Sequence, residues 1–198
     1  MARMRNGVRL SILLAVAALG TAAEATAANA SETIGRLAPT PAVSCTGSTS
    51  DWLEPTVTTG PGYVVPALPG VNALAISSWS HNAAPAPATG ALTFKVFRKI
   101  ADPATYLVVG ADGPRDLTAG AVNTFASDIP AQPGDVIGIN SSMPASTACN
   151  FFDATENPLV RSGNLAVGES GAFASQSEKD VNVSAGVISQ CPARCTKT

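Results

Sequence analysis

Three neighbouring side chains, Asp153, Glu156 and Asn157, could supply oxygen ligands to a metal ion. Calcium is bound in proteins by roughly six to eight oxygens, often collected from one loop. The segment lacks the dense acidic repeat of a strong calcium loop, so solvated turn residues are the competing interpretation. Ca²⁺ is the one cofactor that the sequence suggests, and otherwise we expect none.

Carboxylates also occur in pairs. Asp112 and Asp116 lie in one turn, and Asp153 and Glu156 in another. Glycoside hydrolysis needs two carboxyl groups about 5–10 Å apart across a sugar, which spacing along the chain cannot establish. A carbohydrate hydrolase using two of these turn carboxylates is therefore the enzymatic alternative. The leading prediction is that the protein is not an enzyme.

A Gly-Glu-Ser-Gly segment at 168–171 is similar to the nucleophile segment of trypsin-like proteases. Ser170 would need a histidine base within reach and an acid to orient that base. His81 is the only histidine and lacks the Ala-His-Cys context of those proteases. Ala172 stands where the nucleophile elbow of α/β-hydrolases requires glycine. We interpret the segment as a turn between strands.

A carbohydrate-binding surface would combine an aromatic ring with hydrogen-bonding side chains. Trp52 follows Asp51 in a polar stretch and is the better candidate for an exposed ring. His81 and Asn82 follow Trp79, which alternates with small residues and is expected in the core. The candidate binding residues are Trp52, Asp51, His81 and Asn82.

Four cysteines form an even set, which in an exported protein indicates disulfides. Three connectivities exist, and we favour Cys45 with Cys149 and Cys191 with Cys195. Zinc would need close thiolate pairs and histidine ligands, which this spacing does not supply.

The first thirty residues have the three parts of a secretory signal peptide. Arg3, Arg5 and Arg9 precede an eleven-residue apolar run at Leu10–Gly20, too short to span a bilayer as a helix. Small-x-small patterns allow cleavage after Ala30, which we favour, or after Ala27. We therefore expect a secreted, extracellular protein with no membrane insertion after signal cleavage.

Removal of residues 1–30 takes away three of the 12 basic and one of the 14 acidic residues. The remaining 9 and 13 groups give the mature chain a formal charge of −4. Such a chain without a basic cluster is a poor partner for nucleic acid. We expect a glycan or a cell-surface component as partner.

Strand patterns dominate the rest of the chain, because 15 prolines and 17 glycines interrupt any helical period. At Leu92–Arg98, residues Leu92, Phe94 and Val96 alternate with Thr93 and Lys95, and Phe97 is the exception. About eight short runs separated by turns predict an antiparallel β-sandwich, jelly-roll-like, after an N-terminal signal helix. The other expected strands are at 63–65, 72–80, 106–109, 123–129, 136–139, 165–167 and 181–188. The expected organisation is a signal peptide at 1–30, an extended lead-in at 31–44, a single β-sandwich domain at 45–191 and a tail at 192–198.

The order of several motifs resembles a family of uncharacterised secreted β-sandwich proteins from high-GC bacteria. The resemblance covers roughly residues 34–188, and it implies a secreted β-sandwich without adding an activity. The motifs are Ile34-Gly35, the Gly60–Pro66 and Ile76–Ser80 stretches, Lys95–Arg98, Val108–Gly110 and Ile129–Gly138.

These features together predict a secreted non-catalytic β-sandwich that acts as an extracellular binding or adhesion module, with carbohydrate as one ligand class. The alternative is a structural protein of the envelope or matrix.

Overall fold

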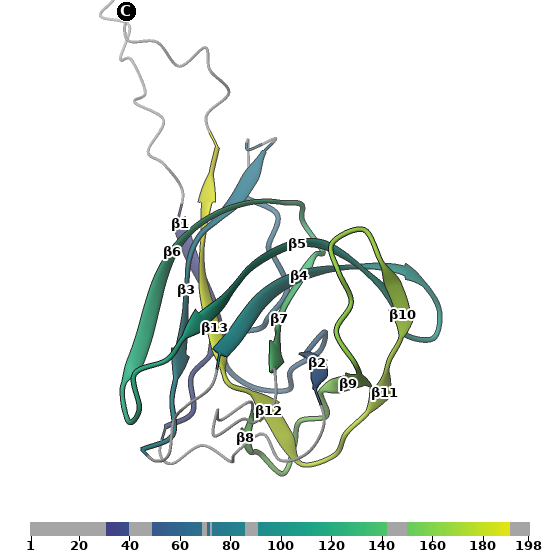
Figure 1. Cartoon of the computed structure of the whole chain (residues 1–198). Helices are drawn as coiled ribbons and strands as arrows, with labels where there is room; N and C mark the ends of the chain where they lie inside the picture. The colour runs from purple at the N-terminus through teal and green to yellow at the C-terminus, as the bar shows by residue number, and fades with distance from the viewer. Residues whose placement is uncertain are drawn as a thin grey trace, which may run out of the picture.

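The computed structural model describes residues 31–39, 49–68, 71, 73–85, 91–141 and 150–190. These residues form β-strands and turns without a helix, which confirms the predicted all-β class. The strands make antiparallel sheets that pack against each other as a sandwich (Figure 1). The predicted signal peptide, all four cysteines and the tail at 192–198 lie outside the described residues.

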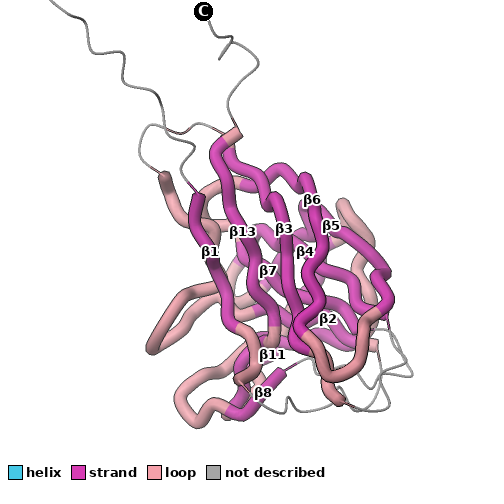
Figure 2. The backbone as a smooth tube through the Cα atoms, turned by 90° about the vertical axis from the view of Figure 1, so that its left-hand side faces the viewer, coloured by secondary structure: helices cyan, strands magenta, loops and turns pink. Residues whose placement is uncertain are grey.

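One sheet has four strands in the order β1, β13, β3 and β6, which lie side by side in Figure 2. Residues 31–44 were expected to be a lead-in ahead of the domain. Ser31–Arg36 instead forms β1 and pairs with β13 along its whole length, so residues 31–36 are part of the sandwich, while residues 40–44 lie outside the described residues. The strands are β1 (Ser31–Arg36), β13 (Val183–Ser189), β3 (Leu74–Asn82) and β6 (Val122–Ala131).

A second sheet has seven strands in the order β10, β5, β4, β7, β2, β9 and β11, and a two-stranded ribbon joins β12 to β8. The strand expected at 165–167 is wrong, since Leu165 is a buried loop residue, and the run at 63–65 makes only the isolated bridge of Val64 to Val136. The strands are β10 (Ser170–Ala172), β5 (Thr105–Asp116), β4 (Ala91–Ala101), β7 (Val136–Ser141), β2 (Ser50–Leu53), β9 (Leu159–Ser162), β11 (Ala174–Ser175), β12 (Lys179–Val181) and β8 (Asn150–Phe152).

The seven-stranded sheet curls until its two edges meet. Its edge strands β10 and β11 are consecutive in the chain and separated only by Phe173. Because β10 pairs with β5 at one edge and β11 pairs with β9 at the other, the sheet must close on itself. In Figure 1, β4 and β5 arch over toward β10. We call this element the curled sheet.

Trp79 occupies the core between the two sheets, as the sequence predicts. Its side chain is fully buried and stacks on Phe94 of β4, with ring centroids 5.5 Å apart. Its indole Nε1–H donates a hydrogen bond of 2.7 Å to Asp112 Oδ2, which satisfies the buried donor.

A second, smaller core fills the inside of the curled sheet. Successive side chains of a strand alternate, so Lys95 and Phe97 point away from the face that carries Phe94. Phe173 meets the rings of Phe97 and Tyr106 edge to face, at centroid distances of 5.6 and 5.7 Å. Phe97 is therefore buried although it lies on the face of β4 opposite Phe94, which explains why it is the exception to the pattern of one buried and one exposed face.

Candidate functional site

The structure does not bring the four predicted carbohydrate-binding residues onto one surface. Asp51 and His81 are both fully buried, in different sheets. Asp51 lies inside the curled sheet, where its carboxylate accepts hydrogen bonds from Lys95, Asn140 and the Leu165 backbone. A carboxylate buried in this way cannot contact a sugar at the surface.

His81 is a core histidine. Its Nδ1 lies 2.7 Å from the backbone oxygen of Asn182, while Nε2 is buried without a partner among the described residues. Burial lowers the pKa of His81 from 6.5 to about 4, so the ring is neutral at pH 7. The next residue, Asn82, donates to the Ala38 backbone oxygen at 2.8 Å and holds the chain after β1 in place.

Trp52 is half-buried, and the expectation of a freely exposed ring is wrong. The ring packs against the core, and the Lys179 ammonium lies 6.0 Å from its centroid. This contact could not be predicted from the residues around Trp52, because Lys179 belongs to the distant strand β12.

Two of the three candidate calcium ligands converge, but they do so on an arginine. Asp153 Oδ2 lies 3.4 Å from Arg36 Nη1, and Glu156 Oε1 lies 3.1 Å from Arg36 Nη2. Asn157 is exposed. Hydrogen bonds from Thr155 lower the pKa of Asp153. Although burial opposes the shift, hydrogen bonds from Thr58 and Arg36 lower the pKa of Glu156.

The same arginine reaches two residues that the sequence did not single out. Arg36 Nη2 lies 2.6 Å from Asp180 Oδ2, and Asp180 in turn accepts a hydrogen bond from the Tyr63 hydroxyl. Burial raises the pKa of Asp180, while Tyr63 and Arg36 oppose that rise. No local motif could have revealed this cluster, because its members come from separate segments of the chain.

Glu54 lies beside this cluster with a fully buried side chain. Both of its carboxyl oxygens are buried. Burial, together with the charges of Asp180 and Glu156, raises the pKa of Glu54 from 4.5 to about 8. One arginine therefore faces four carboxyl groups, and the arrangement favours holding a proton on Glu54. We call Arg36, Glu54, Tyr63, Asp153, Glu156 and Asp180 the acid cluster.

In the acid cluster, the negative charges of the carboxyl groups are balanced by Arg36 and by a proton on Glu54. Among the described residues, no group of three or more His, Cys, Asp or Glu side chains is placed to hold a metal ion.

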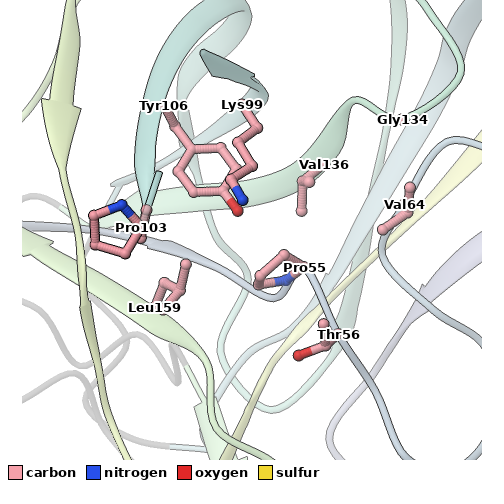
Figure 3. Close-up of a pocket in the computed structure, with 10 residues that line it drawn as sticks. Pro55, Thr56, Val64, Lys99, Pro103, Tyr106, Gly134, Val136 and Leu159 are labelled. Atoms are coloured by element: carbon pink, nitrogen blue, oxygen red, sulfur yellow. The ribbon is translucent and has the colours of Figure 1, made fainter. Parts of the chain in front are cut away.

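A pocket of about 480 Å³ opens at one mouth of the curled sheet (Figure 3). Its walls come from the end of β2, the hairpin between β4 and β5, and the starts of β7 and β9. Most of the lining is apolar. The lining residues are Pro55, Thr56, Val64, Lys99, Pro103, Ala104, Tyr106, Gly134, Val136 and Leu159.

Lys99 and Tyr106 place two hydrogen-bond donors on one wall of this pocket. They are direct cross-strand partners on β4 and β5, and Figure 3 shows the ammonium and hydroxyl groups at the same side. Burial raises the pKa of Tyr106 against the opposing effect of the Lys99 charge, so the phenol keeps its proton at pH 7. Lys99 also pairs with Asp102 at 2.5 Å, where both side chains are well exposed.

A second hollow of about 420 Å³, between β5 and β6, is lined by Asp112, Asp128 and Arg115. It brings one of the predicted turn carboxylates close to a second carboxylate. Both oxygens of Asp112 are already occupied, by Trp79 Nε1 at 2.7 Å and by Arg115 at 2.7 Å. Asp112 therefore braces the sandwich core, while its predicted partner Asp116 does not line the hollow.

The Gly-Glu-Ser-Gly segment forms a turn that leads into β10. Gly168 adopts a left-handed φ of 90°, and Glu169 accepts a hydrogen bond from the Ala166 backbone. Ser170 belongs to the curled sheet and His81 to the four-stranded sheet, which matches the interpretation as a turn.

Within the ranges that the structure covers, there is no helix with the length and apolar character to cross a membrane. Comparisons with protein-family profiles, with curated proteins and with solved structures found no significant match for this chain.

Proposed function

We propose that the protein is a secreted, non-catalytic binding module that holds a small ligand in the pocket at the mouth of the curled sheet. The observation that carries this proposal is the apolar pocket with Lys99 and Tyr106 side by side on one wall. Small-molecule sites commonly measure roughly 300–1,000 Å³ and are found in the mouths of β-barrels. The pocket fits both descriptions.

The lining favours a ligand with an apolar body and a carboxylate end. Proline, valine and leucine side chains make the walls, while the Lys99 ammonium supplies the positive charge and the Tyr106 hydroxyl a second donor. An ion pair as exposed as Lys99 with Asp102 contributes little to stability, because water screens both charges. A carboxylate in the pocket can therefore compete for Lys99 at small cost.

The wall formed by Pro55 and Thr56 is fixed in advance of binding. The Glu156 carboxylate accepts hydrogen bonds from the Thr58 backbone at 2.9 Å and from its hydroxyl at 2.9 Å. On the other side of this wall segment, Glu54 is buried. A fixed wall lowers the entropy cost of binding, which supports a role in recognition.

Isothermal titration with hexanoate, hexanol and hexylamine tests the proposal. The three probes each carry a six-carbon chain and differ in the end group, which is negative, neutral or positive. We expect hexanoate to bind with saturation and the other two to bind at least about tenfold more weakly, from the loss of one charged hydrogen bond. Lys99→Met should abolish the preference for hexanoate. Lys179→Met, which removes a lysine outside the pocket, should keep it.

A glycan array on the same variants separates this proposal from the carbohydrate alternative. Saturable glycan binding that persists in Lys99→Met, with no hexanoate binding in the parent protein, would overturn the pocket proposal.

A further inference from the structure

The ammonium group of Lys95 is held inside the curled sheet by three oxygen atoms. Nζ lies 2.5 Å from Asp51 Oδ1, 2.6 Å from Asn164 Oδ1 and 2.7 Å from the Leu165 backbone oxygen. The Lys95 side chain is only 2% exposed, and that of Asp51 is fully buried. An amine and a carboxylate therefore meet where both are almost closed to water, and the carboxamide of the exposed Asn164 reaches them from the loop.

The carboxylate is fixed from both sides. Asp51 Oδ1 also accepts from Asn140 Nδ2 at 2.8 Å, and Oδ2 accepts from the Leu165 backbone N–H at 2.9 Å. These hydrogen bonds hold the Asp51 carboxylate beside the Lys95 amine. A fixed carboxylate next to a nitrogen nucleophile is the arrangement that general-base catalysis requires.

The surroundings raise the share of the uncharged amine, which is the nucleophilic form. Burial lowers the pKa of Lys95, although the hydrogen bond and charge of Asp51 oppose that change. In a nearly dry site, transfer of a proton from the ammonium to Asp51 also removes two buried charges.

From this geometry we infer that Lys95 and Asn164 join in an intramolecular isopeptide bond, with Asp51 as the group that moves the protons. The Lys95 Nζ lone pair attacks Asn164 Cγ, and the bond from Cγ to the amide nitrogen then breaks. Two of the three ammonium protons pass through Asp51 to the leaving nitrogen, which departs as ammonium. The third proton stays on the new amide, and Asp51 returns to the carboxylate form.

Asn164 is an exposed loop residue, so the leaving ammonium has a path to solvent. The bond would tie β4 to the loop between β9 and β10, across 69 positions of the chain. This loop covers the inner core of the curled sheet through Leu165. The cross-link is independent of the ligand pocket, because neither Lys95 nor Asn164 lines it.

Mass spectrometry of the reduced and alkylated full-length product, as purified, tests the inference. We expect the measured mass to be lower, by one ammonia, than the mass calculated for the same alkylated chain without a cross-link. Trypsin should release residues 162–179 attached to a peptide that contains Lys95, because the cross-link also blocks cleavage after that lysine. Asn164→Ala should restore the full mass of its sequence, and Asn157→Ala, a matched exposed asparagine, should keep the loss.

Asp51→Asn should also restore the full mass while the chain stays folded by circular dichroism. If that variant does not fold, Lys95→Arg keeps the charge and removes the nucleophile, and the branched peptide must then be absent. If the parent protein has the full mass calculated from its sequence, the inference is overturned, and Lys95 takes part in an ion-pair network only. Loss of water, from a bond between Lys95 and Asp51, or loss of ammonia that persists in Asn164→Ala, would overturn it as well.

Discussion

Lys95 and Asp51 meet across strand β7, with Nζ 2.5 Å from Oδ1, although their own strands β4 and β2 do not pair directly. On β7, Gly138 lies opposite Lys95, while Asn140 lies opposite Asp51. A Cβ atom at Gly138 would lie 2.1 Å from the Trp52 backbone oxygen and 2.9 Å from the Phe97 ring. The absence of a side chain at Gly138 thus allows the β2 backbone and the Phe97 ring to pack closely against β7.

In the Asn164→Ala background, where no cross-link forms, breaking this ion pair from one side should be more harmful than removing it. Lys95→Met leaves the Asp51 carboxylate buried without its cation, and we expect the free energy of unfolding to fall by about 3–5 kcal/mol. The double variant Lys95→Met with Asp51→Asn should recover part of this loss. Urea denaturation measures both values, and a double variant with the sum of two independent losses would contradict the pairing.

The stability of the protein should fall as the pH rises toward 8, because of Glu54. Its pKa is raised to about 8 in the fold, so the folded state keeps a proton that the unfolded chain loses near 4.5. The stabilisation is complete below pH 4.5 and is lost as the pH rises to about 8, at up to about 1.4 kcal/mol per pH unit.

Glu54→Gln removes this ionisation and should flatten the pH dependence of the unfolding free energy between pH 5 and 8. Glu32→Gln changes an exposed glutamate of β1 and should leave the dependence as it is. Equal slopes in Glu54→Gln and in the parent protein would show that Glu54 is not buried as an acid.

His81 should have the opposite effect on the acid side. Because its pKa is lowered to about 4, the unfolded chain takes up a proton near pH 6.5 while the folded ring stays neutral. The stabilisation from neutral His81 is present above pH 6.5 and is lost as the pH falls through 4. His81→Asn should lower the unfolding free energy at pH 7 relative to its value at pH 5, as measured by urea denaturation. An unchanged difference between the two pH values would speak against a neutral, buried ring.

The two tryptophans should differ in their importance for stability. Trp79→Phe keeps an aromatic ring in the core but leaves the Asp112 carboxylate without its indole donor, for a loss of about 1–3 kcal/mol. Trp52→Phe changes a half-buried ring whose indole makes no hydrogen bond among the described residues. The free energy of unfolding should fall by less than about 1 kcal/mol. Thermal unfolding compares the two variants, and a larger effect at Trp52 would contradict the placement of Trp79 in the main core.

The sequence was sufficient for the class of fold and for the main core. Alternation at Leu92, Phe94 and Val96 identified β4, and the small neighbours of Trp79 identified a buried tryptophan. Both signals are local, since they depend on side-chain direction along one strand.

The sequence was not sufficient for the polar sites. Alternation places Lys95 on the face opposite Phe94, but only the curl of the sheet and the cover from the 163–173 loop bury that face. Arg36, Glu54 and Asp180 likewise meet through contacts between distant segments. The predicted surface positions of Asp51, in a polar stretch, and His81, near a strand end, are wrong because contacts with distant segments bury both side chains.

Chemical-shift mapping by NMR, with hexanoate titrated into uniformly ¹⁵N-labelled protein, tests the proposed ligand site most directly. We expect saturable shifts that concentrate on the backbone amides of Thr56, Lys99, Tyr106 and Val136, around the pocket at the mouth of the curled sheet. Shifts that are absent, or that concentrate on the four-stranded sheet around His81 and Asn82, would contradict the assignment of this pocket as the binding site.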